Sequence, residues 1–159
     1  MKKIFHTKNL KETQNLSEKA IEIAKKQSRE NAAALGLVGD LGGGKTSFTQ
    51  GLAKNLGIKK DVLSPTFILM QSYPLLGKKF PWKNFYHLDV YRVKSSKEIL
   101  KLGFEEIIKN NQNIVVVEWA DIIKDIMPKN TLWIEFEWLD ENERKIIFQK
   151  THPHKFLIN

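Results

Sequence analysis

The sequence predicts an α/β protein in three α/β/α layers, with a mostly parallel central sheet and antiparallel edge strands. Two short runs, residues 33–38 and 114–117, are apolar at almost every position, which is typical of strands covered on both faces. The first run leads through a glycine-rich segment into apolar residues at helical spacing, so a strand, a loop and a helix follow one another. The chain has 159 residues, the length of one domain, and we expect residues 1–159 to form a single unit.

The glycine-rich segment, residues 39–46, reads Gly-Asp-Leu-Gly-Gly-Gly-Lys-Thr and matches the pattern G-x-x-x-x-G-K-[ST] of loops that bind nucleotide triphosphates. Its glycines let backbone N–H groups turn inward around phosphate oxygens. Lys45 supplies a cation to the outer phosphates, Thr46 offers a hydroxyl to Mg²⁺, and the helix that starts there directs its positive dipole end at the anion. The alternative is a turn that binds nothing, but an ordinary turn does not need four glycines followed by Lys-Thr. The segment therefore predicts a P-loop NTPase.

Periodicity and turn residues predict the other elements of the first half of the chain. These are a short strand, an amphipathic helix, the helix of the loop, and two strands that form an antiparallel hairpin, at residues 4–5, 10–28, 45–57, 67–73 and 84–88. Ser64-Pro65-Thr66 marks a break before the hairpin, and residues 76–79 form its turn.

In the second half, Ser95 and Glu98 have the spacing of a capping box, so a helix begins there, and Gly103 interrupts it. The remaining elements are a helical turn or two, a central parallel strand, a short helix closed by a proline, and a final hairpin at one edge of the sheet. They fall at residues 104–109, 114–117, 121–127, 131–138 and 144–150.

Composition narrows the class of protein further. The sequence contains no cysteine, which excludes disulfides and thiolate chemistry, and no apolar stretch approaches the length of a membrane span. We therefore expect a soluble cytoplasmic protein, with neither a membrane nor DNA as a partner. The net charge of +8 fits either a solvated lysine-rich surface or an anionic partner such as RNA.

A P-loop that uses Mg²⁺ usually needs an acidic residue at the end of a neighbouring strand. Asp89 follows the predicted strand 84–88, and Glu118 follows the apolar run 114–117. Because that run has no alternation, it fits the sheet core beside the loop strand, and we assign Glu118 to the metal. We assign Asp89 to the attacking water, as its orienter or base. The alternative for each is a surface carboxylate at a strand end.

Two more residues are candidates near the nucleotide. Thr66 follows Pro65 and can sense the outer phosphate, although the residues alone favour a plain turn. Trp119 directly follows Glu118. A side chain that covers the nucleotide and a side chain in the core are equally consistent with this position.

These motifs, in this order and spacing, resemble the bacterial TsaE family, also called YjeE. The resemblance rests on the glycine-rich loop and on Ser64-Pro65-Thr66-Phe67, His87-Leu88-Asp89-Val90-Tyr91-Arg92, Leu102-Gly103-Phe104-Glu105-Glu106 and Glu118-Trp119-Ala120. It spans residues 30–125 and implies the ATPase component needed to form threonylcarbamoyladenosine beside the anticodon of tRNA. It also implies two partner proteins, TsaB and TsaD, with tRNA reached only through their complex.

Carried over by position, the resemblance implies a set of residues that bind ATP phosphates: Asp40, Leu41, Gly42, Gly43, Gly44, Lys45, Thr46 and Ser47. It implies Mg²⁺ at Thr46 and Glu118, and catalytic roles for Lys45 and Asp89. Thr66 is then the phosphate sensor, and Trp119 lies close to the nucleotide. The family also contacts the base through its N-terminal segment, here near Thr7, although no motif fixes that residue.

The implied chemistry is attack of water on the γ-phosphate, with charge neutralised by Lys45, the loop amides and Mg²⁺. No arginine finger is evident; Arg92 is the nearest candidate, so we expect slow turnover without the partners. A small-molecule or nucleotide kinase shares the loop and size, but three scattered arginines make a poor lid. A GTP-dependent switch protein is a second alternative, but the sequence lacks the Asn-Lys-x-Asp motif that reads guanine. An RNA-binding module has only the net charge in its support.

Overall fold

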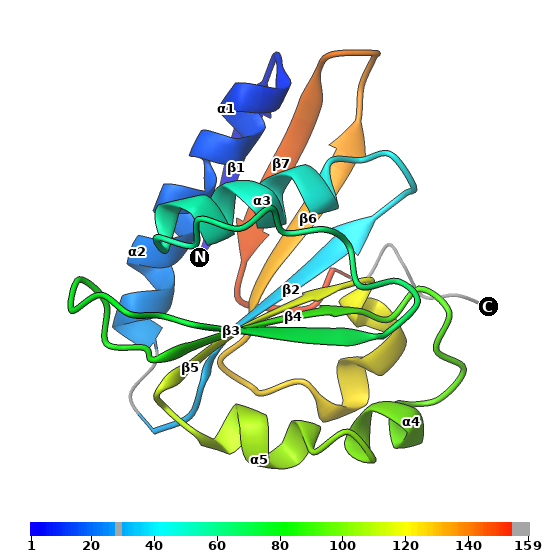
Figure 1. Ribbon diagram of the computed structural model, residues 1–159. Helices are drawn as coiled ribbons and strands as arrows, with labels where there is room; N and C mark the ends of the chain where they lie inside the picture. The colour runs from blue at the N-terminus through cyan, green and yellow to red at the C-terminus, as the bar shows by residue number, and fades with distance from the viewer. Residues whose placement is uncertain (28–29, 154–159) are drawn as a thin grey trace.

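The computed structural model describes residues 1–27 and 30–153, and the described residues form one mixed sheet between two layers of helices (Figure 1). The strands are β1 (Lys2–Thr7), β2 (Ala33–Gly39), β3 (Met70–Pro74), β4 (Asn84–Asp89), β5 (Asn113–Glu118), β6 (Leu132–Trp138) and β7 (Arg144–Gln149). The helices are α1 (Leu10–Asn15), α2 (Ser17–Gln27), α3 (Lys45–Asn55), α4 (Ser96–Leu100), α5 (Phe104–Lys109) and the 3₁₀ helix η1 (Ala120–Ile126).

The sheet has the order β1-β7-β6-β2-β5-β4-β3. Strands β6, β2, β5 and β4 are parallel neighbours, whereas β7, β1 and β3 pair antiparallel. This arrangement confirms the predicted α/β fold with a parallel centre. The sequence predicted the final hairpin at an edge of the sheet, and this was wrong. Strand β6 lies directly beside β2, and β1 pairs with the outer side of β7. The burial patterns explain this, because β6 is buried over most of its length and β1 is largely exposed.

Each face of the sheet carries its own apolar core. On β5, Ile114 and Val116 pack in the core that contains Phe48 and Leu52 of α3. The alternate residues of the same strand, Val115 and Val117, pack in the second core, which holds Ile99 of α4 and Phe104 of α5. The strand is therefore apolar at every position because both of its faces are covered. Figure 1 shows α1, α2 and α3 over one face, with α4 and α5 over the other.

The helix predicted at residues 10–28 is divided in two, which the sequence did not reveal. Helix α1 ends at Asn15, α2 begins at Ser17, and the predicted last residue, 28, lies outside the described residues. At the break, Ser17 Oγ donates a hydrogen bond to the carbonyl of Gln14 (2.6 Å) and accepts one from Asn55 Nδ2 (2.9 Å). Contacts with α3 thus fix the break, and they come from residues distant in the chain.

The strand predicted at residues 67–73 begins later, at Met70. The carbonyl of Pro65 accepts hydrogen bonds from the amides of Ile68 and Leu69, so the preceding residues form a turn. Leu69 has a φ of 64°, an uncommon conformation for a side chain with a Cβ. Pairing with β4 starts directly afterwards, with Met70 opposite Leu88. The antiparallel hairpin itself is confirmed.

Gly51 allows α1 and α3 to approach closely. A Cβ at Gly51 would lie 2.4 Å from the carbonyl oxygen of Gln14 and 2.6 Å from its Cα, so one helix would have to move. We predict that Gly51→Ala lowers the free energy of unfolding by about 1 to 3 kcal/mol through overpacking. Chemical denaturation of the two proteins measures this difference.

Gly77→Ala is the matched control, because the nearest atom to a Cβ there is 4.0 Å away. It should leave the free energy of unfolding within about 0.5 kcal/mol of the original protein. Equal stability of the two variants would contradict the close approach of α1 and α3.

Candidate nucleotide-binding site

The glycine-rich loop connects the end of β2 to the start of α3, as predicted. Gly39, Gly42 and Gly44 have φ values of 137°, 75° and 103°, which residues with a Cβ rarely adopt. A Cβ at Gly39 would also lie 2.3 Å from the carbonyl oxygen of Phe136 on β6. The loop therefore needs glycine at these positions for its conformation and, at Gly39, for space.

Lys45 lies at the first position of α3, with its side chain turned back over the loop. Its Nζ donates hydrogen bonds to the carbonyl oxygens of Gly39 (2.6 Å) and Asp40 (2.8 Å) and lies 3.8 Å from the ring centroid of Trp119. Burial lowers the pKa of Lys45 to about 8, against the opposing charge of Glu118. All three contacts are with neutral groups, so the cation keeps its attraction for a phosphate.

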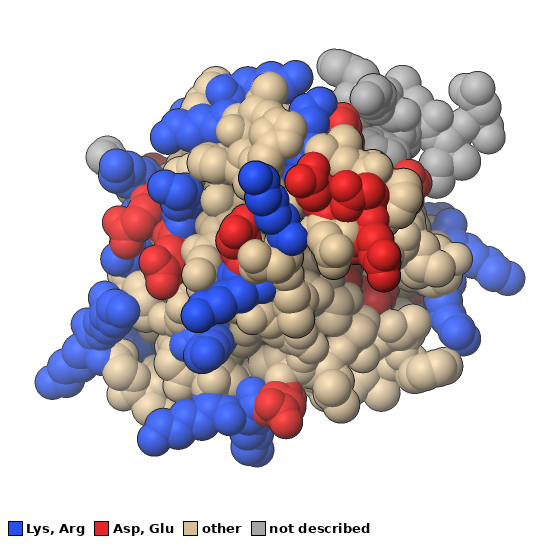
Figure 2. Space-filling model, turned by 90° about the horizontal axis from the view of Figure 1, so that it is seen from above, with Lys and Arg blue, Asp and Glu red and all other residues tan. Residues whose placement is uncertain are grey.

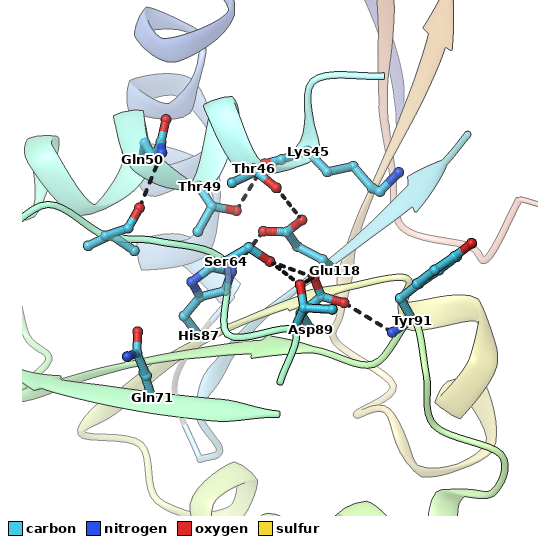
Figure 3. A network of polar contacts seen from close by, with 12 residues as sticks. Lys45, Thr46, Thr49, Gln50, Ser64, Gln71, His87, Asp89, Tyr91 and Glu118 are labelled. Carbon is cyan, nitrogen blue, oxygen red and sulfur yellow. Dashed lines mark hydrogen bonds and ion pairs between the residues drawn. The ribbon is translucent and has the colours of Figure 1, made fainter. Parts of the chain in front are cut away.

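Glu118 lies at the end of β5, buried, and both of its carboxylate oxygens accept hydrogen bonds (Figure 3). Thr46 Oγ1 donates to Oε2 at 2.8 Å. His87 Nε2, on the neighbouring strand β4, lies 2.7 Å from Oε1. An ionised carboxylate only accepts, so His87 donates from Nε2 to such a carboxylate. The carboxylate is thereby fixed with one oxygen turned toward the first turn of α3.

Asp89, the last residue of β4, is held by three donors. Its Oδ2 accepts hydrogen bonds from Ser64 Oγ (2.6 Å) and Thr66 Oγ1 (3.0 Å), and its Oδ1 accepts one from the backbone amide of Tyr91 (3.0 Å). The break at residues 64–66 and the strand end at Asp89 thus meet at one point (Figure 3). Sequence reasoning identified Thr66 but missed Ser64, which makes the shorter hydrogen bond.

A cavity of about 550 Å³ joins these groups at the carboxyl ends of β2, β4 and β5. Eleven of the twelve predicted site residues line it: Leu41, Gly42, Gly43, Gly44, Lys45, Thr46, Ser47, Thr66, Asp89, Glu118 and Trp119. Asp40 is not part of the lining, and it contributes its carbonyl to Lys45 instead.

The sequence analysis missed the other wall of the cavity. Asn9, Leu10 and Thr13 line it from the start of α1. Glu141 and Asn142 line it from the connection between β6 and β7, and Arg144 from the start of β7. No motif marks these positions, because only the sheet brings them to the loop. Thr7, the residue suggested for the base, is buried outside the lining, and its hydroxyl pairs with that of Thr13 at 2.9 Å.

The two described arginines near the cavity already have contacts. Arg144 Nη1 donates to the carbonyls of Asp140 (2.7 Å) and Glu143 (3.0 Å), and its Nη2 donates to that of Gly42 (3.3 Å). It therefore joins the β6–β7 connection to the loop. The guanidinium of Arg92 lies 4.7 Å from the ring centroid of Phe67.

The fold and the loop together define a P-loop nucleotide-binding protein. Comparisons with known proteins agree with this class: the crystal structure of YdiB from Bacillus subtilis superposes with a TM-score of 0.68 at 30% identity, over 93% of this chain and 84% of that one. The family model "Threonylcarbamoyl adenosine biosynthesis protein TsaE" matches residues 7–146. The chain belongs to the TsaE family, which confirms the resemblance noted from its motifs.

Relatives in this family are similar over much of the chain. The tRNA threonylcarbamoyladenosine biosynthesis protein TsaE of Rickettsia prowazekii is 39% identical over 157 residues, which are 98% of this chain and 99% of the relative. The Bacillus subtilis protein of the same name is 40% identical over 72% of this chain and 67% of its own length. Within the described part of the chain, no helix has the length and apolar character needed to cross a membrane.

The lowered pKa of Lys45 gives a test of the site. At about pH 8.5 the free protein holds Lys45 partly deprotonated, whereas a bound phosphate favours the charged form and raises its pKa. We predict that ADP binding at this pH is accompanied by proton uptake. Calorimetric titrations in buffers with different ionisation enthalpies measure this uptake.

The exposed Lys54 of the same helix provides the control. Lys54→Met should leave the proton uptake unchanged, because that ammonium lies outside the cavity lining. A binding enthalpy that is the same in every buffer at this pH would contradict the lowered pKa of Lys45.

Proposed function

We propose that this protein binds ATP with Mg²⁺ and hydrolyses the ATP to support the formation of threonylcarbamoyladenosine on tRNA. The observation that carries the proposal is the convergence, in one cavity, of the loop, a lysine without a carboxylate partner in direct contact, a paired hydroxyl and carboxylate, and a second held carboxylate. Membership of the TsaE family supplies the link to tRNA modification. The partners are TsaB and TsaD, as the family resemblance implies.

The residues fit a magnesium ion shared with a nucleotide. Mg²⁺ prefers oxygen ligands and is usually held by one or two carboxylates together with substrate phosphates. The hydroxyl of Thr46 and the carboxylate of Glu118 lie side by side, 2.8 Å apart, and suit this metal. The described residues contain no group of three or more acidic or histidine side chains that could hold a metal ion. When bound, the ion would neutralise charge on the phosphates.

In the proposed reaction, a water molecule forms a bond to the γ-phosphorus while the bond to the β,γ-bridging oxygen breaks, which yields ADP and phosphate. Asp89 orients this water and accepts its proton. Lys45 leaves the carbonyls of Gly39 and Asp40 to contact the phosphates, and the loop amides surround them. Thr66 is suited to sense the outer phosphate, since its hydroxyl already contacts Asp89.

His87 positions Glu118 in this scheme. It is fully buried on β4, and its Nδ1 has no hydrogen-bond partner among the described residues. The ring therefore makes one polar contact, to Glu118 Oε1, and that contact turns Oε2 toward Thr46. Groups that orient a metal ligand in this way commonly change metal affinity when they are replaced.

The first prediction of this proposal concerns turnover. Asp89→Asn should keep nucleotide affinity while lowering ATP hydrolysis by about 10²- to 10⁴-fold, because the general base is lost. Lys45→Ala should lose nucleotide binding as well. We expect the original protein to turn over faster when purified TsaB and TsaD are added together, as measured by phosphate release.

Asp61→Asn makes the same change at an exposed position outside the cavity. It should leave both nucleotide affinity and ATP hydrolysis unchanged. A lower affinity for Mg²⁺ in Asp89→Asn but not in Glu118→Gln would reverse the roles of the two carboxylates. An unchanged rate with TsaB and TsaD would remove the proposed partners. Phosphate transfer to nucleosides would point to a kinase instead, and preference for GTP would point to a switch protein.

The second prediction concerns His87. His87→Leu should raise the Mg²⁺ concentration needed for half-maximal binding of a fluorescent ATP analogue by about 10- to 100-fold, because Glu118 is no longer oriented. His87→Gln should restore most of this affinity, since the glutamine amide can donate to the same carboxylate oxygen.

The affinity for the analogue in EDTA, without Mg²⁺, distinguishes a positioning role of His87 from a general loss of structure. This affinity should be equal in the original protein and both variants. An unchanged Mg²⁺ requirement in His87→Leu, with Glu118→Gln still impaired, would contradict the positioning role while leaving the proposed function intact.

A further inference from the structure

A second and larger cavity, of about 890 Å³, lies at the other end of α3. It is bounded by the last residues of that helix, by the segment 57–60, and by β3 with the turn that follows it. Helix α3 has 11 residues, and at 1.5 Å per residue its two ends are about 16 Å apart. The cavity is therefore separate from the candidate nucleotide site, with which it shares none of its lining residues.

The cavity combines an apolar floor with a positive rim. Four lysines line it, Lys54, Lys59, Lys60 and Lys79, and none of the described residues in its lining is acidic. Leu76, at its margin, is 94% exposed, so a large aliphatic side chain faces solvent there. Figure 2 shows basic side chains projecting on the left of the molecule, the side on which α3 ends in Figure 1, with some acidic side chains among them. We call this cavity the lysine groove.

One carboxylate lies beside the groove, on α2. The pKa of the exposed Glu22 carboxyl lies below its usual value because of its hydrogen bond to Lys25, with the charges of Lys26 and Lys79 acting in the same direction. Glu22 therefore offsets part of the positive charge outside the lining of the groove. The groove instead presents charge of one sign, which favours an anionic occupant.

The aromatic rings of the groove already have contacts with neighbouring side chains. Phe80 stacks on Trp82, with centroids 6.1 Å apart, and Lys25 and Lys79 place their Nζ atoms 5.0 and 5.2 Å from the Phe80 centroid. Tyr73 likewise stacks on Phe85. Single-stranded RNA is usually bound by open aromatic faces on which bases stack. The groove offers aliphatic side chains in their place, which suit an aliphatic side chain of a protein.

The position of β3 adds a constraint on the shape of the occupant. β3 is the last strand of the sheet, and Ser72, Tyr73 and Pro74 from it line the groove. Exposed sheet edges bind extended peptides through main-chain hydrogen bonds, with pockets for alternate side chains. An extended segment along this edge would present its side chains alternately to the groove and to solvent.

We propose that the lysine groove binds an extended acidic segment of a partner protein, with an aliphatic side chain against Leu76 and Ile58 and carboxylates beside the lysines. The groove and the nucleotide cavity share no lining residue, and we expect this contact to form without nucleotide.

A peptide library tests this proposal on the full chain. The library holds short peptides with acidic residues fixed at alternate positions and all residues allowed between them; a second library has Asn and Gln at the fixed positions. We expect the immobilised protein to enrich peptides with Leu, Ile or Val from the acidic library alone. Fluorescence anisotropy then measures the affinity of the most enriched peptide.

The double substitution Lys59→Glu/Lys60→Glu should lower the affinity for that peptide by about tenfold or more. Lys2→Glu/Lys3→Glu makes the same charge change on β1, at the opposite edge of the sheet, and should leave the affinity within about twofold. All four lysines are exposed, and circular dichroism checks that both variants fold.

Three outcomes would overturn the proposal: no enrichment from the acidic library, equal enrichment from the Asn and Gln library, or equal weakening by the two variants. Tighter binding of poly(U) or tRNA than of any enriched peptide, with the same dependence on Lys59 and Lys60, would show that the groove takes RNA instead. Neither ATP nor ADP is present in any of these experiments. A negative result for the groove would therefore leave the proposed ATPase function untouched.

Discussion

The hydrogen bond from Thr46 to Glu118 joins the first turn of α3 to the end of β5, and the geometry of the site depends on it. The two residues are 72 positions apart in the chain. They meet because β2 and β5 are parallel neighbours, with Leu37 opposite Glu118, and because Phe48 and Leu52 bury one side of α3 in the core. The distance between a hydroxyl and a carboxylate is thus set by sheet register and apolar packing, neither of which involves a ligand.

The same register determines where the other polar groups lie. Asp89 is opposite Glu118 in the pairing of β4 with β5, so two carboxylates end adjacent strands at one edge. Together with Lys45 they form a group of buried ionisable side chains, which costs stability unless each is hydrogen-bonded. Hydroxyls, amides, carbonyls and an imidazole satisfy them, and these are groups that a nucleotide or a metal can displace or recruit. The arrangement favours function over stability.

The sequence predicted those parts of the site that are encoded locally. The loop conformation follows from its glycines, and Asp89 and Glu118 were found because each comes directly at the end of a predicted strand. The opposite wall of the cavity could not be found in this way: Asn9 and Arg144 come from segments that only the sheet order brings together. The break of the first helix was missed for the same reason, since Asn55 on α3 holds Ser17 at the start of α2.

The lysine groove gathers four of the lysines behind the net positive charge, which the sequence left divided between a solvated surface and an RNA partner. On a purely solvated surface, carboxylates would be interspersed among the lysines, yet none of the described residues that line the lysine groove is acidic. Single-stranded RNA is usually bound on open aromatic faces, whereas Phe80 and Tyr73 each have one face stacked against another ring. What remains is an apolar groove with a basic rim along a sheet edge, and an acidic, extended protein segment satisfies each of these features at once.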